Sequence, residues 1–244
     1  QPAGTYTGKV KYVLVHPNDA ATPSTPLYFQ DATSADCGET MYDNRDTDTY
    51  KNVAYTTATI NDLCWMTRNL DLPGGTALTS SDTNLNGVTA SYALPASSTS
   101  GFSDNATAYV YNSGRTVCSN NSTTGSCYSY YSYAAATAGT NPSSGEADSD
   151  ICPKGWRLPT SAELTTLTNA YTTGETLAAS PFLGVYAGYF YNDDFYYGGS
   201  NGFYWSSTAD SDYGADCLGF GSDSALVYRA YKSSGVSIRC VAKS

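Results

Sequence analysis

Residues 152–171 read CPKGWRLPTSAELTTLTNAY and contain the clearest local signal in the chain. Thr160 precedes Glu163 by three residues, which is the spacing of a capping box at the start of a helix. Leu164 and Leu167 follow at the spacing of neighbours on one helix face. The stretch therefore predicts a helix that begins just after Thr160.

Four large apolar side chains are expected in the core. Trp156 and Leu158 stand just before the predicted helix, and we expect them to pack it onto a sheet. Trp65 and Trp205 are expected to be buried as well, because aromatic side chains contribute most to core packing.

The composition limits the class of partner. The 244 residues carry a formal net charge of -10, and such a chain repels phosphate backbones and anionic lipids. Nucleic acid and membrane surfaces are therefore not expected as partners. No apolar run is long enough to span a bilayer, so direct membrane insertion is not expected either. Because no signal peptide is visible and the chain begins at Gln1, we expect a mature or trimmed ectodomain.

The N-terminal part of the chain is expected to contain one strand. Residues 6–16 (YTGKVKYVLVH) alternate polar and apolar side chains, which predicts a strand. Residues 17–26 are rich in Pro and Thr and predict a linker. Residues 43–70 predict a hairpin with an Asp-rich turn and β-branched strands.

The rest of the chain predicts an α+β fold. Residues 71–126 are dense in Ser, Thr, Asn and Gly and predict loops. Residues 127–139 contain the alanines of a short helix, which Gly139 would end. Residues 182–241 predict short strands joined by Gly- and Asp-rich loops. Two short helices and a β- and loop-rich C-terminal half define an α+β layout.

The cysteines predict an oxidising compartment, because stable disulfides form there. No Cys-x-x-Cys pair occurs and His16 is the only histidine, so the residues do not favour a zinc site. Three disulfides and one remaining thiol are the simplest arrangement for seven cysteines. Cys118 and Cys127 flank a polar loop and are predicted to form one bridge, whereas the spacing leaves the other pairings open.

Three stretches of the chain resemble a known family. They are LCWMTRNLDL (63–72), ICPKGWRLPTSAEL (151–164) and the ending GFYWSSTADS…GVSIRCV (202–241). Together they resemble the FISUMP domain, a major paralogous domain named from Fibrobacter succinogenes and found in bacterial surface proteins. The resemblance predicts an N-terminal strand and linker over residues 1–36 and a FISUMP domain over residues 37–244.

The resemblance implies a C-type-lectin-like fold related to the formylglycine-generating enzymes. In such folds the terminal strands pair, helices flank a small sheet, and a long C-terminal loop region forms the ligand face. The family pattern also implies a Cys152–Cys240 disulfide and leaves Cys37 and Cys64 as the third pair. Cys217 would then be a free thiol, open to alkylation in the folded protein. The alternative is that Cys217 is bridged and another cysteine is free.

The C-terminal region also resembles the variable segment of proteins that retroelements diversify by mutating adenines in the gene. Such segments scatter Tyr, Asn, Asp, Ser and Gly over binding positions on a fixed scaffold. Mutating adenines in Asn codons cannot produce Lys, Glu, Gln or Met, and residues 186–231 contain none of them. The one Trp in this window, Trp205, falls in the scaffold motif YWSST.

The same region supplies the predicted ligand-binding residues. Because side chains alternate along a strand, Leu218 and Phe220 are expected on one face of the sheet. Tyr204 and Trp205 are adjacent and are expected on opposite faces, so one of these two rings can face solvent. Tyr and Arg offer large contact area at low entropic cost, while Asp, Asn, Ser and Gly adapt their hydrogen bonds, as in antibody paratopes. The predicted ligand-binding residues are Asn192, Asp193, Asp194, Tyr196, Tyr197, Asn201, Phe203, Asp210, Asp212, Tyr213, Asp216, Cys217, Asp223, Tyr228, Arg229 and Tyr231. The alternative is a tyrosine-rich sheet whose rings only cover neighbouring strands.

Metal and catalytic sites have weaker support. Asp43, Asp46 and Asp48 form an oxygen-rich loop of the kind that holds calcium, but the EF-hand spacing is absent and a solvated turn is favoured. No cofactor is expected. A Ser–His–Asp arrangement would need His16, which stands alone on the predicted N-terminal strand. Cys217 with Cys240 only loosely resembles the reactive pair of the formylglycine-generating enzymes, so no enzymatic activity is expected.

These observations predict an extracellular ligand-binding protein of the adhesin or receptor type. Its expected partner is a protein or a glycan on another cell surface. One alternative is a structural subunit of a surface appendage such as a pilus. A further alternative is an enzyme of the formylglycine-generating type.

Overall fold

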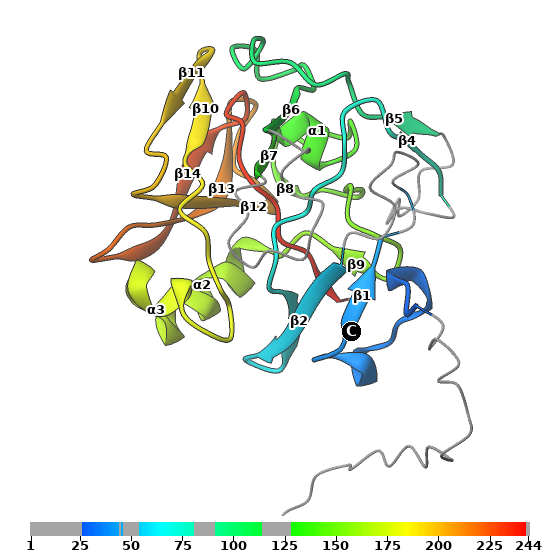
Figure 1. Cartoon of the computed structure of the whole chain (residues 1–244). Helices are drawn as coiled ribbons and strands as arrows, with labels where there is room; N and C mark the ends of the chain where they lie inside the picture. Colours follow the sequence, from blue (N-terminus) through cyan, green and yellow to red (C-terminus); the bar gives the residue numbers. More distant parts are fainter. Residues whose placement is uncertain (1–25, 44, 46–53, 81–90, 114–127, 243–244) are drawn as a thin grey trace, which may run out of the picture.

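The computed structural model describes residues 26–43, 45, 54–80, 91–113 and 128–242. In this part of the chain, short strands form two main sheets and three small α-helices lie outside them (Figure 1). The architecture is α+β, as the sequence predicts. The strand predicted over residues 6–16 lies outside the described residues.

The first sheet pairs the last described strand with a strand from the N-terminal half of the chain. Its strand order is β1-β2-β3-β15-β9. Asn61 and Asp62 join β2 to β3 with φ angles of 49° and 62°, the left-handed backbone that a two-residue hairpin turn requires. The hairpin predicted within residues 43–70 is therefore confirmed only in part, because its turn is Asn61–Asp62 and most of the predicted Asp-rich turn lies outside the described residues. The bounds of the strands are β1 (Thr40–Tyr42), β2 (Ala54–Ile60), β3 (Leu63–Met66), β15 (Val241–Ala242) and β9 (Trp156–Arg157).

The second sheet contains the long C-terminal strands. Its order is β14-β13-β12-β8, and all its pairs are antiparallel. The helix α2 (Ser161–Ala170) packs on β12, β13 and β14. The series of short strands predicted over residues 182–241 is therefore confirmed. The bounds of the strands are β8 (Gly145–Glu146), β12 (Gly202–Ala209), β13 (Gly214–Phe220) and β14 (Ala225–Tyr231).

The capping box at the start of α2 is confirmed. The Glu163 backbone N–H donates to the Thr160 hydroxyl at 3.2 Å, and the Thr160 backbone N–H donates to the Glu163 carboxylate at 2.8 Å. Arg157 also donates to both carboxylate oxygens of Glu163. Leu164 and Leu167 are buried in one cluster that contains residues of β12 and β13. The helix is thus fixed at its first turn and along its apolar face.

The residues that pack α2 onto the sheet differ from those predicted. Trp156 and Leu158 belong to a separate cluster, where the ring of Trp156 meets Phe29 edge-on at 5.0 Å. Trp65 instead joins the cluster of Leu164. The reason is that β9, which carries Trp156, pairs with β15 in the first sheet. The chain division predicted at residue 36 stays a prediction, although Phe29 already packs in the core.

The other elements are short. The helix predicted within residues 127–139 is confirmed only in part, because Tyr128–Tyr131 pairs with Val110–Ser113 as strand β7 beside β6. Helix α1 covers Tyr133–Ala136, and Gly139 follows it with a φ of 82°. The remaining elements are η1 (Phe29–Asp31), η2 (Ser34–Asp36), β4 (Ala77–Leu78), β5 (Tyr92–Ala93), α3 (Gly174–Ala178), β10 (Tyr189–Tyr191) and β11 (Asp194–Tyr196).

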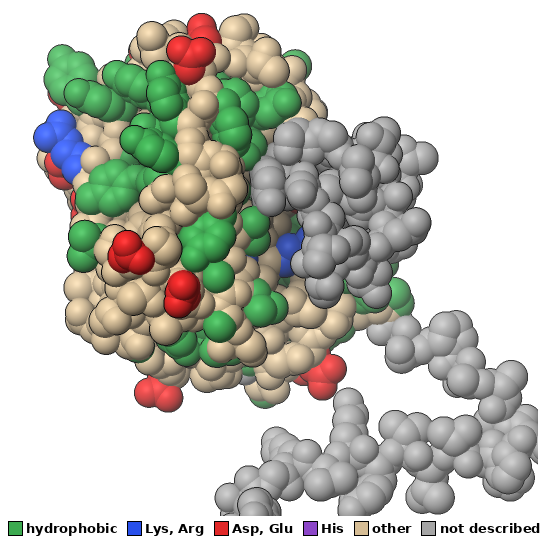
Figure 2. Space-filling model, turned by 60° about the vertical axis from the view of Figure 1, so that its left-hand side comes forward, with side chains coloured by type: hydrophobic (Ala, Val, Ile, Leu, Met, Phe, Trp, Pro, Cys, Tyr) green, Lys and Arg blue, Asp and Glu red, His purple; other side chains and the backbone are tan. Residues whose placement is uncertain are grey.

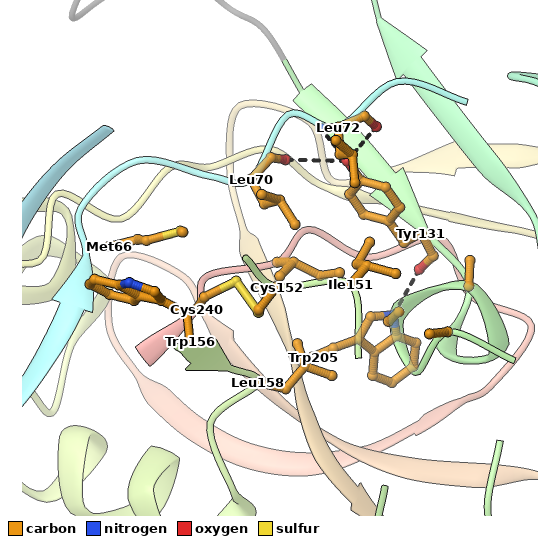
Figure 3. Packing of buried hydrophobic residues seen from close by; sticks show 14 of the residues in the cluster. Met66, Leu70, Leu72, Tyr131, Ile151, Cys152, Trp156, Leu158, Trp205 and Cys240 are labelled. Atoms are coloured by element: carbon orange, nitrogen blue, oxygen red, sulfur yellow. Dashed lines mark hydrogen bonds between the residues drawn. A yellow bond between two sulfur atoms is a disulfide. The ribbon is translucent and has the colours of Figure 1, made fainter. Parts of the chain in front are cut away.

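Two disulfides connect these elements. Cys37 is bonded to Cys64, and Cys152 is bonded to Cys240 across 88 residues of sequence. Both are the pairings that the family resemblance implied. Figure 3 shows the Cys152–Cys240 bond among the side chains of the largest buried cluster. Cys118 and Cys127, predicted to be bridged, lie outside the described residues.

The expected core residues are buried. Trp65 and Trp156 are each 2% exposed, and Leu158 and Trp205 are fully buried. The expectation that Tyr204 or Trp205 faces solvent is wrong, because Tyr204 is only 1% exposed. The two rings point to opposite faces of β12, but one face meets the α2 cluster and the other meets the largest cluster.

Replacing Trp156 by alanine is expected to destabilise the protein by about 3–5 kcal/mol, because it leaves a cavity beside Phe29 in a packed core. Chemical unfolding with the disulfides intact measures this change. Leu183→Ala is the matched control, since the Leu183 side chain is 43% exposed and should lose much less stability. Equal unfolding midpoints for the wild type and Trp156→Ala would contradict the packing described for β9.

Candidate functional site

The β10–β11 hairpin is a fixed support for the candidate site. Asn192 and Asp193 form its turn with φ angles of 49° and 64°. The Asp193 carboxylate accepts hydrogen bonds from the backbone N–H groups of Gly101 and Phe102. On one face of the hairpin, Phe190 stacks on Phe102 at 5.5 Å between ring centroids. Asn192 and Asp193, predicted as ligand residues, therefore build and anchor the turn.

The other face of the hairpin carries a series of stacked tyrosines. The ring of Tyr189 stacks on Tyr196 at 5.5 Å and on Tyr197 at 6.0 Å. Tyr189 also meets Phe203 of β12 edge-on at 5.0 Å. Phe203 in turn lies 6.1 Å from the ring of Tyr228 on β14. The aromatic contacts thus run without a break from the hairpin to the edge of the second sheet.

A second contact joins the same elements. Tyr191, two residues after Tyr189 on β10, stacks on Tyr231 at the end of β14 with centroids 5.4 Å apart. Tyr231 is followed by Lys232, whose backbone N–H donates to the Tyr213 carbonyl at 3.0 Å. The turn that carries Tyr213 therefore lies beside the end of β14.

Most of the exposed large hydrophobic side chains of the described residues lie on the hairpin, on β14 and in the turn beside them. Eight such side chains are exposed in the described residues, and all except Leu183 lie between positions 195 and 231. We call these seven the tyrosine surface. Figure 2 shows hydrophobic side chains gathered on this side of the molecule. The members of the tyrosine surface are Phe195, Tyr196, Tyr197, Tyr213, Leu226, Tyr228 and Tyr231.

One ion pair lies at the margin of the tyrosine surface. The Arg229 guanidinium contacts the Asp210 carboxylate at 3.0 Å and donates to the Ser211 hydroxyl at 3.1 Å. A side chain on Gly214 would collide with both partners, so this glycine lets the guanidinium lie flat on β13. Both charged groups remain well exposed, with side-chain exposures of 53% and 37% for Arg229 and Asp210.

The other predicted polar residues lie around the same region. Asp194, Asp212 and Asp223 are exposed, on β11, in the β12–β13 turn and in the β13–β14 turn. Asn201 and Asp216 are half-buried. The Asn201 side-chain oxygen accepts from Ser200 at 3.0 Å, and Asp216 stands opposite Arg229 in the β13–β14 ladder. The exposed carboxylates make the surroundings of the tyrosine surface acidic.

Two predicted ligand residues are not at the surface. Phe203 is 7% exposed and Cys217 is fully buried, because the face of the sheet that carries them packs on the largest cluster. Cys217 is free, as expected, but the expected ready alkylation is wrong. Its thiol donates to the Leu218 carbonyl at 3.2 Å, and burial raises the pKa of Cys217 to about 12.

Tyr228 covers this buried thiol. Its ring lies across Gly219, where any side chain would collide with it. Tyr228 stands opposite Cys217 in the β13–β14 ladder, and burial raises the pKa of Tyr228 above its usual range, with the neighbouring Cys217 as the next cause. Tyr228 as a whole is 39% exposed. Tyr228 presents a ring edge to solvent and also shields Cys217.

Sequence reasoning missed four aromatic or apolar residues of this region. Tyr189 and Tyr191 alternate with Phe190 along β10, and that period of two was a usable signal. Phe195 and Leu226 are 49% and 64% exposed, although apolar residues in a strand usually point inward. Nothing in the local sequence distinguishes Leu226 from a core residue.

One of the three aspartates considered for calcium lies within the described residues. Asp43 is buried and forms an ion pair with Arg45 at 2.7 Å, so its carboxylate is already paired. Asp46 and Asp48 lie outside the described residues. Within the described residues, no group of three or more His, Cys, Asp or Glu side chains is placed to hold a metal ion. Calcium binding therefore stays an untested alternative.

Fold and site together define a disulfide-bonded α+β protein with an exposed aromatic surface. The chain belongs to the family of the Fibrobacter succinogenes major domain, whose family model matches residues 58–180. No curated protein and no solved structure matches the chain. The match runs from β2 to just beyond α3, and the tyrosine surface lies C-terminal to it.

Two observations bear on the compartment. The Cys37–Cys64 and Cys152–Cys240 disulfides are compatible with an extracellular protein. Among the described residues, no helix is both long enough and apolar enough to cross a membrane.

Alkylation of Cys217 in the folded protein at pH 8 is expected to be on the order of a thousandfold slower than alkylation of an ordinary thiol, because so little thiolate forms. Tyr228→Ala should speed the reaction by opening the sheet face above the sulfur. Tyr228→Phe is the matched control, since it keeps the ring and should stay slow. Mass spectrometry after timed treatment with iodoacetamide measures all three rates, and fast labelling of the wild type would contradict the buried position.

The raised pKa of Cys217 also predicts how stability depends on pH. Below about pH 9 the thiol is protonated in both states, so its contribution is fully present. Between about 9 and about 12 the unfolded chain loses this proton and the folded chain keeps it, so stability falls as the pH rises. Urea unfolding of Cys217→Ala should therefore show a smaller loss of stability between pH 8 and pH 10 than the wild type. Equal losses would contradict the raised pKa.

Proposed function

We propose that this protein is an extracellular ligand-binding protein, of the adhesin or receptor type, and that the tyrosine surface is its binding face. The partner is a protein or a glycan on another cell surface. The observation that carries the proposal is the concentration of exposed aromatic side chains between residues 195 and 231. Contiguous exposed apolar patches usually mark interaction sites, whereas isolated exposed residues do not.

The chemistry of the tyrosine surface supports binding. A tyrosine ring offers apolar area and a polar tip with only two side-chain torsions to restrict, so it binds at low entropic cost. The Tyr189–Tyr196–Tyr197 stack holds these rings in place before any partner arrives. A preorganised surface loses less freedom on binding, which favours affinity.

We propose a C-type-lectin-like fold, supported by the position of the last strand, β15, between β3 and β9 in the first sheet. The proposed ligand face lies in the C-terminal part, where such folds carry it. Diversification by a retroelement is supported only by the residue usage of positions 186–231. A reverse transcriptase gene and a near-copy of the 3′ coding segment beside the gene would test this.

A binding role is preferred over an enzymatic one. The reactive cysteine pair of a formylglycine-generating enzyme would have to be Cys217 and Cys240 in this chain. Cys240 is bonded to Cys152, and the buried Cys217 holds its proton up to a pKa of about 12. Neither sulfur is therefore an available nucleophile in this state. A structural role in a surface appendage stays the alternative function.

Replacing Tyr197, Tyr213 and Tyr231 together by serine is expected to weaken partner binding by about 30-fold or more, the loss of at least one interface hot spot. These three rings are 59%, 62% and 54% exposed, so the fold should be retained. Tyr228 is left unchanged because it shields Cys217. Binding of the labelled full chain to glycan arrays and to immobilised cell-surface proteins measures the effect.

The control for this experiment is Leu183→Ser. Leu183 is the one exposed large hydrophobic side chain of the described residues that lies outside the tyrosine surface. Its replacement should leave binding unchanged. Full binding by the triple serine variant, with an unchanged melting temperature, would show that the ligand site lies elsewhere.

A further inference from the structure

The outer edge of β14 is defined by its hydrogen bonds. At its two ends, Lys232 donates to the Tyr213 carbonyl and the Ser224 carbonyl accepts from Gly221, both at 3.0 Å. Even-numbered residues of β14 therefore direct their backbone groups toward β13, and odd-numbered residues direct theirs away. Ala225 confirms the pattern, since its N–H donates outward to the Thr172 carbonyl at 3.0 Å.

Within the part of the chain that the structure describes, the outward backbone groups in the middle of β14 are unpaired. The N–H and C=O groups of Val227 and Arg229 make no backbone hydrogen bond with any other described residue. The other strands that end the two main sheets have only two or three residues, whereas β14 has seven. The open stretch is Val227–Arg229, since the Ala225 N–H is bonded to Thr172 and the Tyr231 carbonyl accepts from the Ser234 N–H at 2.8 Å. Free N–H and C=O groups on a strand edge are a template for another strand.

The Thr172 loop covers one end of the β14 edge, but several other protections of an edge strand are missing. Its ladder with β13 runs in continuous register from Gly214–Tyr231 to Phe220–Ala225, without a bulge, and the strand contains no proline. The one charged side chain, Arg229, is paired with Asp210. Leu226 is 64% exposed beside the open edge. Natural proteins usually block such edges with charge, proline or a bulge, so an open apolar edge points to a partner strand.

The sequence itself predicts a strand with matching properties. Residues 6–16 alternate, with Val10, Tyr12 and Leu14 on one face and Lys9 and Lys11 on the other. The two lysines are basic groups in a chain of net charge -10. Carboxylates lie near the β14 edge, namely Asp212 in the β12–β13 turn and Asp216 opposite Arg229, together with Asp210, which is already paired with Arg229. Charge and pattern are thus complementary.

We propose that residues 6–16 of one copy of this protein add to the open edge of β14 in a second copy. Backbone hydrogen bonds to Val227 and Arg229 would hold the added strand. Its apolar face would lie beside Leu226 and Tyr228, so Tyr12 would extend the tyrosine surface. Its lysines would lie on the face of Arg229 and Asp216. The inference goes beyond the proposed function, because it concerns the assembly of copies.

The place where the N-terminal segment leaves the described structure favours binding to a second copy over binding within the same chain. Residue 27 is held at β1, where the Leu27 carbonyl accepts from the Tyr42 N–H at 2.9 Å. Figure 1 shows β1 and β14 on opposite sides of the molecule. A donor segment on one side and an acceptor edge on the other make a head-to-tail contact, which builds rows of molecules.

Sedimentation velocity of the full chain across a range of concentrations tests the proposal. The wild type should form oligomers that grow with concentration. Val227→Pro should remain monomeric, because proline removes an outward N–H and leaves the β13 ladder intact. Val227→Thr, which keeps the N–H and the strand preference, is the matched control and should assemble like the wild type.

The donor segment is tested separately. Replacing both Lys9 and Lys11 by glutamate should weaken assembly at least tenfold, whereas replacing both by arginine should not. A synthetic peptide of residues 6–16 should bind the full chain and dissolve the oligomers, and a scrambled peptide should do neither. If Val227→Pro melts at a lower temperature than the wild type, its loss of assembly could come from misfolding. The peptide experiment then tests the proposal on the unmodified protein.

Three results would overturn the proposal. They are a monomeric wild type at every concentration, assembly that persists in a well-folded Val227→Pro, and an unchanged state with the peptide present. If residues 6–16 paired with β14 of the same chain, the wild type would be monomeric at every concentration. The triple serine variant of the tyrosine surface should still assemble, so loss of ligand binding and loss of assembly are distinguishable.

Discussion

The rest of the structure depends on the burial of β12 and β13 on both faces. On one face, Tyr204 and Leu218 pack with the apolar stripe of α2. On the other, Trp205 packs in the largest cluster and donates its ring N–H to the Tyr131 carbonyl at 2.7 Å (Figure 3). A register slip of one residue would exchange every side chain between these two environments. The pair is therefore a rigid platform, and the hairpin, the turns and β14 take their positions from it.

A buried arginine connects this platform to the segment before the hairpin. Arg239 is fully buried, with its guanidinium over the rings of Phe182 and Tyr204 at 4.5 and 5.0 Å. It donates to the Asn69 side-chain oxygen at 3.0 Å and to the carbonyls of Phe182 and Leu183. Burial lowers the pKa of this group, which shows the cost of desolvating it. The hydrogen bonds and rings offset that cost and fix residues 182–183, from which the chain enters the hairpin.

The candidate site lies at the margin of the sheet, where the strands are no longer buried on both faces. Phe203 and Cys217 are inside the platform, while Tyr228, which lies beside both, is partly exposed. The hairpin adds a second layer of rings over the same margin. Exposed aromatics are therefore held by buried ones, which gives a surface that is both apolar and rigid. The unpaired edge of β14 lies along this margin, so binding and assembly would use neighbouring parts of one sheet.

Local chemistry in the sequence determined the capping box at Thr160 and Glu163, the Gly139 helix end and the alternating strands of the C-terminal half, because each depends on neighbours in the chain. The residue types of the C-terminal region also indicated where the tyrosine surface lies. Only the tertiary structure decided which of those residues face solvent. Alternation assigns Phe203 and Cys217 to one side of a strand, but it cannot show that a second cluster covers that side. The exposure of Leu226 and the two roles of Tyr228 likewise depend on which strand lies at the edge, and long-range packing sets that.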